Sequence, residues 1–174
     1  MISSEKMLKH MAWANAEILS QVATLEDEAL SAYAVNPEWT VREIIQHLVR
    51  SAHFYGYRLQ IRSPADIQSG ENDRNDYIQN EKAPVCSSEI SKMVESLQAA
   101  DAVLLGEAQL DDGTVYREVE GKLIERARST IIFQAIHHAT EHRAQLVSAL
   151  EARGYSSISL DEFDLWAYAD KFGE

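Results

Sequence analysis

The chain has 174 residues, of which 45% are hydrophobic and 25% are charged, and its formal net charge is −12. This length suits a single domain over residues 1–174, and the composition is that of an ordinary globular protein. A strongly negative chain repels nucleic-acid phosphates and anionic lipids, so we expect neither nucleic acid nor a membrane as a partner. The only cysteine, Cys86, has no intramolecular disulfide partner, and the first residues lack a signal-like apolar stretch. We therefore expect a cytoplasmic protein.

Hydrophobic residues recur mostly three and four positions apart, which predicts a mainly helical chain. The pattern predicts a first helix over residues 5–25 and a second from Thr40 to about Ile61. Thr40 and Glu43 match a capping box, in which the two side chains accept backbone N–H groups at the helix start. The polar residues 62–84 contain two of the three prolines, so we interpret them as a long crossover within one bundle.

A third helix is expected over residues 87–108. After it, residues 114–127 alternate in hydrophobicity around the turn EGK, with Val115 and Val119 placed against Leu123. This pattern predicts a short hairpin-like excursion, too short to define a sheet.

A fourth helix is expected over residues 128–153, ended by Gly154 in a left-handed conformation. The tail after it carries enough apolar residues to pack back onto the helices. Together these elements predict an all-α fold: a four-helix bundle with a long crossover between its second and third helices, a hairpin-like excursion before the fourth, and a packed C-terminal tail.

Three of the six histidines, His137, His138 and His142, lie close together in the fourth predicted helix. A helix advances about 100° per residue, so His142 falls near the middle of the apolar face, His138 on its shoulder, and His137 points away. His138 and His142 are one turn apart, a spacing that lets two imidazoles share one metal ion. The alternative is a pair of neutral core histidines that form hydrogen bonds with each other or with carbonyls. These residues alone do not separate the two interpretations.

A catalytic zinc ion usually has three protein ligands, so the third ligand must come from another helix. His47 lies on the flank of the second helix's apolar face and is the first candidate. His10 in the first helix is the reserve candidate, whereas His53 faces more toward solvent. Glu141 is a candidate general base, or an exposed charge, because its predicted direction lies off the apolar face.

Four segments carry a resemblance to a known family: MAWANAEIL, WTVREIIQHLVRSAHFY, HHATEHRAQLVSALEARGY and LDEFDLWAYA. The most specific element is His138 followed by His142 and then Arg143, Gln145 and Leu146. With these segments the sequence resembles the DinB/YfiT-like proteins over nearly its whole length.

The resemblance implies a four-helix bundle, often a homodimer, that holds a divalent ion such as zinc or nickel on His47, His138 and His142. Many relatives have N-H-x-x-H-H-R where this chain has H-H-A-T-E-H-R. Glu141 thus stands where an additional histidine often precedes the last ligand. This difference removes no ligand, but it changes the charge beside the site.

Relatives with known activity include thiol-dependent transferases and an isomerase that use a low-molecular-weight thiol as cosubstrate. The leading hypothesis is therefore a metal-dependent transferase that activates such a thiol for attack on an electrophilic small-molecule substrate. One alternative is a metal-dependent hydrolase with Glu141 as the base. The other is a non-catalytic, metal-stabilised binding or stress-response protein, in which a fourth protein ligand such as His10 closes the site.

Overall fold

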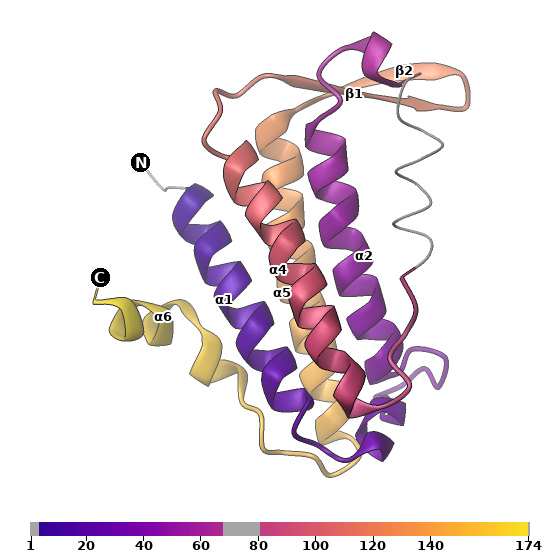
Figure 1. Cartoon of the computed structure of the whole chain (residues 1–174), viewed down its shortest axis with the longest axis vertical. Helices are drawn as coiled ribbons and strands as arrows, with labels where there is room; N and C mark the ends of the chain where they lie inside the picture. Colours follow the sequence, from indigo (N-terminus) through magenta and orange to yellow (C-terminus); the bar gives the residue numbers. More distant parts are fainter. Residues whose placement is uncertain (1–3, 68–80, 174) are drawn as a thin grey trace.

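The structure, a computed structural model that describes residues 4–67 and 81–173, contains a bundle of four long helices (Figure 1). These helices are α1 (Ser4–Val22), α2 (Val41–Leu59), α4 (Ile90–Glu107) and α5 (Arg128–Glu151). Both α1 and α2 pack against α4 and α5, so the helices follow one another around the bundle as α1, α4, α2, α5. The hydrophobic core lies between all four. Most of the predicted crossover, residues 68–80, lies outside the described part of the chain.

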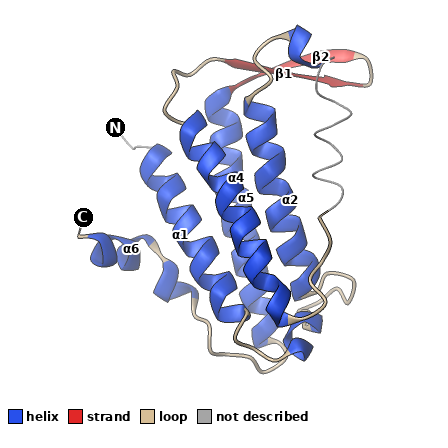
Figure 2. Ribbon diagram, viewed as in Figure 1, coloured by secondary structure: helices blue, strands red, loops and turns tan. Residues whose placement is uncertain are grey.

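Short elements connect and extend the bundle (Figure 2). They are the 3₁₀ helices η1 (Asp27–Ser31), η2 (Ser87–Glu89) and η3 (Leu160–Phe163), the strands β1 (Thr114–Val119) and β2 (Lys122–Ala127), and the short helix α6 (Leu165–Phe172). The tail packs onto the bundle through Phe163 and Tyr168, which are both buried. Among the described residues, no helix is long and apolar enough to span a membrane.

The starts and ends of the helices differ in detail from the predicted ones. The first helix ends at Val22 instead of residue 25. Thr40 is the N-cap of α2, as predicted, but its side chain caps no backbone N–H group. Its hydroxyl donates instead to the Glu43 carboxylate. A charged oxygen three residues away is the stronger acceptor, so the predicted reciprocal capping box is replaced by a bond between the two side chains.

An arginine at the start of α5 joins three helix ends. Its side chain is almost fully buried, and Arg128 Nη1 donates to the carbonyl of Leu59 at 3.0 Å. Arg128 Nη2 donates to the Glu107 carbonyl at 2.7 Å and to the Glu107 carboxylate at 2.8 Å. Leu59 and Glu107 are the last residues of α2 and α4, whose final carbonyls lack partners within their own helices. The arginine therefore satisfies both helix ends and places its charge where the helix dipoles favour a cation.

The hairpin closes this end of the bundle. Glu120 and Gly121 form its two-residue turn with φ angles of 51° and 74°, the left-handed conformation that tight hairpins require. Its antiparallel register pairs Leu123 with Glu118, so the prediction that Leu123 faces the same side as Val115 is wrong. The residue count of the turn fixes the register, and with it the face on which each side chain lies.

Candidate metal centre

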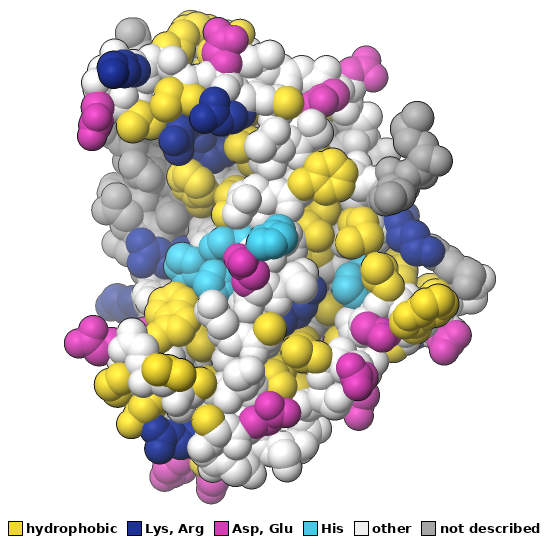
Figure 3. Space-filling model, turned by 180° about the vertical axis from the view of Figure 1, so that it is seen from behind, with side chains coloured by type: hydrophobic (Ala, Val, Ile, Leu, Met, Phe, Trp, Pro, Cys, Tyr) yellow, Lys and Arg dark blue, Asp and Glu magenta, His cyan; other side chains and the backbone are white. Residues whose placement is uncertain are grey.

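Three histidines from two adjacent helices converge on one side of the bundle. The Nε2 atom of His138 lies 3.1 Å from that of His47 and 3.0 Å from that of His142. One ring nitrogen from each residue lies within 4.8 Å of the others, as the ligands of a single metal ion must. Figure 3 shows histidine side chains gathered near the centre of this face, where they reach the surface. The structure thus brings together the three residues that the sequence singled out.

The helical period and the packing of α2 against α5 explain this convergence. His138 and His142 follow each other by one turn on α5, so their side chains lie on the same face of the helix. His47 lies on α2 beside Leu48, which is buried in the core next to α5. A side chain at the edge of the buried face of α2 can therefore reach across to α5 without leaving the bundle.

The protonation state of His142 follows from its neighbours. The indole Nε1 of Trp39 can only donate, and it lies 2.9 Å from one side-chain atom of Gln145, so that atom is the amide oxygen. The same oxygen lies 2.9 Å from Nδ1 of His142, so Nδ1 must carry the proton. Nε2 of His142 then has a free lone pair that points at the other two histidines. A metal ligand requires this tautomer, and its second nitrogen commonly donates to such an acceptor.

Burial keeps the cluster uncharged near neutral pH. It lowers the pKa of His138 to about 4, with the neighbouring His142 and His47 as secondary causes. Burial also lowers the pKa of His47, and it lowers that of His142 against the opposing effect of the Gln145 hydrogen bond. Neutral imidazoles are the form that binds a metal, so the donor set fits a divalent ion.

Two other candidates of α5 lie outside the cluster. The side chains of His137 and Glu141 are 68% and 53% exposed, and His137 Nδ1 lies 3.5 Å from a Glu141 oxygen. His137 therefore points away from the site, as predicted. Glu141 acts on the cluster only through its charge, which opposes the lowering of the His142 pKa.

The remaining two histidines have partners elsewhere. His10 is buried, and its Nε2 lies 2.8 Å from the carbonyl oxygen of Phe163, so it anchors the tail and does not join the cluster. His53 is half-buried, with its Nε2 atom 3.0 Å from Ser96 Oγ on α4. The prediction that His53 faces solvent is wrong because α4 packs against that side of α2.

Aromatic rings surround the cluster, and the position of Trp39 among them was not foreseen from the sequence. The ring centroid of Trp39 lies 5.3 Å from that of His47 and 5.8 Å from that of His142. Tyr55 lies 5.5 Å from His138, and its hydroxyl forms a hydrogen bond with Gln134. Burial raises the pKa of Tyr55, so the hydroxyl stays protonated and able to donate.

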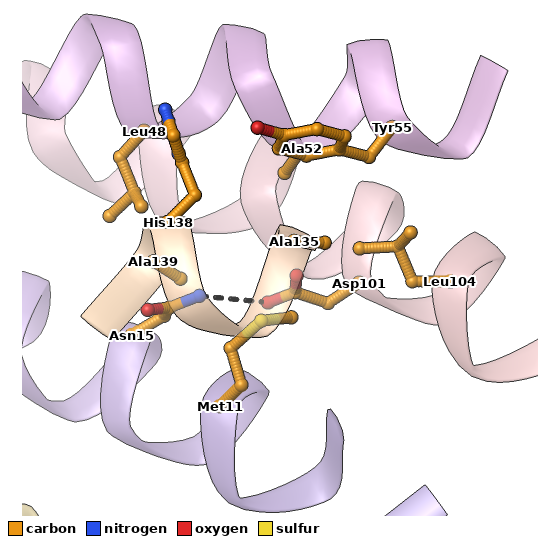
Figure 4. A pocket seen from close by; sticks show the side chains of 10 residues that line it. All are labelled: Met11, Asn15, Leu48, Ala52, Tyr55, Asp101, Leu104, Ala135, His138 and Ala139. Atoms are coloured by element: carbon orange, nitrogen blue, oxygen red, sulfur yellow. Dashed lines mark hydrogen bonds between the residues drawn. The ribbon is translucent and has the colours of Figure 1, made fainter. Parts of the chain in front are cut away.

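A narrow pocket beneath His138 leads toward a buried carboxyl group (Figure 4). Asp101 is 2% exposed and accepts a 3.4 Å hydrogen bond from Asn15, whose own oxygen accepts from Arg143 at 2.8 Å. Burial raises the pKa of Asp101 to about 7. In Figure 4 the ring nitrogen of His138 points away from Asp101, so this carboxyl group is no fourth ligand in the cluster.

The fold and the cluster define a helical-bundle protein with a three-histidine site that is compatible with divalent metal binding. The model of the DinB family matches residues 1–171, so the chain belongs to the DinB family. The resemblance seen in the sequence is thereby confirmed over nearly the whole chain. Searches among curated proteins and among solved structures found no match.

Proposed function

We propose that the protein binds one divalent metal ion through His47, His138 and His142, and that it transfers a low-molecular-weight thiol to an electrophilic substrate. Family membership and the converging histidines support the metal. The expected small thiol, and the choice of zinc or nickel, rest on the resemblance to thiol-dependent relatives and on the preference of these ions for imidazole. The homodimer expected from the same resemblance stays a prediction.

The observation that carries the proposal is the number of protons available among the three rings. Nε2 of His138 is close to both other Nε2 atoms, yet a neutral ring nitrogen carries either one proton or one lone pair. The proton of His142 is on Nδ1, where Gln145 accepts it. If His138 Nε2 donates to His142, it has no lone pair for His47. If it accepts from His47, two lone pairs face each other.

Neutral histidines therefore cannot form both short contacts as separate, linear hydrogen bonds. A protonated ring would need a pKa above neutrality, but burial lowers the pKa of all three. A cation between three lone pairs satisfies all of them at once, which favours a metal site over a structural histidine pair.

When bound, a divalent ion on three neutral imidazoles would retain its charge and an exchangeable position, and so would favour the thiolate form of a small thiol. The sulfur would form the new bond to the electrophilic carbon, the leaving group would take the electron pair of the broken bond, and the thiol proton would pass to solvent. The chain's own residues position the metal ligands: Gln145 holds His142, and the ring of Trp39 packs against His47 and His142. The protonated hydroxyl of Tyr55 can donate to a substrate oxygen.

The two alternatives have less support. A hydrolase would need a base near the nucleophilic water, and the expected base Glu141 is exposed and lies beside His137. A closed, non-catalytic site would need a fourth protein ligand. Within the described residues, the reserve candidate His10 is held by Phe163 and the cluster contains three histidines alone.

Metal content of untagged protein, measured by plasma mass spectrometry, tests the proposal. Wild type and His137→Ala are expected to carry about one equivalent of a transition metal, and His47→Ala and His142→Ala are expected to lose it. Metal-loaded wild type should then conjugate a small thiol to members of an electrophile panel. Absence of metal after reconstitution refutes the metal site, whereas metal binding without any conjugation refutes the transferase.

A further inference from the structure

A second cavity lies between the hairpin and the outer faces of α2 and α5. Its volume is about 290 Å³, near the lower end of the range for small-molecule sites. Three arginines line it, Arg58, Arg117 and Arg126, together with aromatic and aliphatic side chains that include Phe54. No aspartate or glutamate of the described residues is among the lining groups. In a chain with a net charge of −12, this concentration of positive charge is unexpected.

The strand register explains why the cavity is basic. Arg117 pairs with Ile124, and Val115 pairs with Arg126, so these four side chains share one face of the hairpin. All four line the cavity. The alternate positions carry glutamates such as Glu118, whose side chains lie on the opposite face. The hairpin thus separates its charges and presents arginines to the cavity.

Two of these guanidinium groups have donors available for a ligand. Arg117 forms no hydrogen bond or ion pair within the described residues. Arg126 donates from Nη1 to the neighbouring Glu125 carbonyl at 2.7 Å, which leaves most of its five N–H groups. Arg58 donates to the Tyr116 carbonyl at 2.8 Å, a bond that holds its charge at the edge of the cavity. Several arginine N–H donors close together suit the oxygen atoms of a carboxylate or a phosphate group.

The cavity adjoins the histidine cluster. Gln134 lines the cavity and precedes His138 by four residues on α5, a rise of about 6 Å along the helix. Tyr55 lines the cavity as well, and its ring contacts that of His138. Figure 3 shows Lys and Arg side chains on the same face as the histidines, toward the hairpin end, with apolar side chains between the two groups. One small molecule can therefore span both places.

We propose that this cavity binds the anionic end of a small-molecule substrate that carries a carboxylate or phosphate group on an apolar body. Arg117 and Arg126 bind the anion, and Phe54 and the hairpin's aliphatic side chains contact the apolar body. The reactive end of the molecule then lies toward His138. Binding of the anion is independent of the metal, but its role as a substrate subsite rests on the proposed function.

Calorimetric titration of metal-free protein with benzoate, phenyl phosphate and the uncharged analogue benzamide tests the proposal. Benzoate or phenyl phosphate should bind, and benzamide should bind at least about tenfold more weakly, because charge-assisted hydrogen bonds are lost. Arg117→Gln and Arg126→Gln should each weaken anion binding by about tenfold. Lys92→Gln removes the same charge from an exposed position on α4 outside the cavity lining, and should change binding less than twofold.

The comparison of the two anions identifies the preferred headgroup. The proposal is overturned if both arginine variants bind the anions as wild type does, or if Lys92→Gln weakens binding as much as they do. It is also overturned if the anions bind only to metal-loaded protein and the arginines have no effect, because the anion is then a metal ligand. That last result leaves the proposed metal-dependent function intact. Arginine-dependent binding in a protein that takes up no metal supports the cavity and refutes the function instead.

Discussion

Replacing Gln145 with leucine is expected to weaken metal binding while leaving the bundle folded. The substitution removes the oxygen that accepts 2.9 Å hydrogen bonds from both His142 and Trp39. His142 is then free to rotate or to move its proton to Nε2, where the proton competes with the metal. Leucine keeps the helix propensity and approximate size of glutamine, so α5 itself should be unaffected.

The expected loss of metal affinity follows from these two hydrogen bonds. Each hydrogen bond contributes about 0.5–1.5 kcal/mol net, and Gln145 lies at the surface, where water can partly replace it. A total near the lower end, about 1.4 kcal/mol, corresponds to roughly a tenfold loss of affinity. Losses of metal affinity of roughly tenfold to hundredfold are typical when the hydrogen-bond partner of a metal-binding histidine is removed, and the expected value agrees with them.

Competition with a chromophoric chelator at neutral pH would measure this affinity. Gln98→Leu, the same change at an exposed position of α4, is the matched control and should bind metal as wild type does. Gln145→Glu should keep or increase the affinity, because a carboxylate accepts from both His142 and Trp39. A Gln145→Leu protein that binds metal within about twofold of wild type would show that another contact sets the tautomer of His142.

Three further predictions concern pH and stability. Burial lowers the pKa of all three cluster histidines, to about 4 for His138, so protons should compete with the metal only at a lower pH than they do for exposed imidazoles. A decline in metal affinity that begins above pH 7 would contradict this. The pKa of Asp101 is raised by burial from its ordinary value of 3.8 to about 7 in the folded protein. Between these two pH values the folded state therefore keeps the proton that the unfolded state loses. Relative to Asp101→Asn, wild type should therefore lose stability in urea as pH rises from 4 to 7, by an amount on the order of 4 kcal/mol, and an equal pH dependence of the two proteins would contradict this. Glu107→Ala leaves the buried Arg128 without its carboxylate and should cost about 3–5 kcal/mol of unfolding free energy, whereas Glu5→Ala, which removes an exposed ion pair, should leave the unfolding free energy almost unchanged.

The helices and the histidine cluster were predictable because they depend on short-range periodicity. His138 and His142 are one turn apart wherever their helix lies, and the apolar face of α5 shows which histidine turns inward. The prediction of His47 as the third ligand required one further assumption, that its helix lies beside α5. The structure bears out that assumption through the packing of α2 against α5.

The contacts that the sequence could not predict depend on how distant segments are placed. Trp39 precedes α2 and meets Gln145 across 106 positions, so no local pattern connects them. His53 was misplaced because the apolar face of one helix does not reveal which neighbour covers its flank. Leu123 was misplaced because the two-residue turn shifts its strand by one position relative to the alternation assumed from the sequence.

If the cavity binds an anion as proposed, its selectivity depends on which face of the hairpin carries the arginines. Arg117 is followed by Glu118, and Arg126 is preceded by Glu125, so each of the two hairpin arginines that line the cavity has an acidic neighbour on the opposite face. A one-residue shift of both strands would exchange the two faces and put glutamates over the cavity. The same backbone would then select cationic molecules, with the histidine cluster unchanged. One insertion or deletion in each strand would thus reverse the charge that the hairpin presents to the cavity, and it would also turn the buried Val115 to the other face.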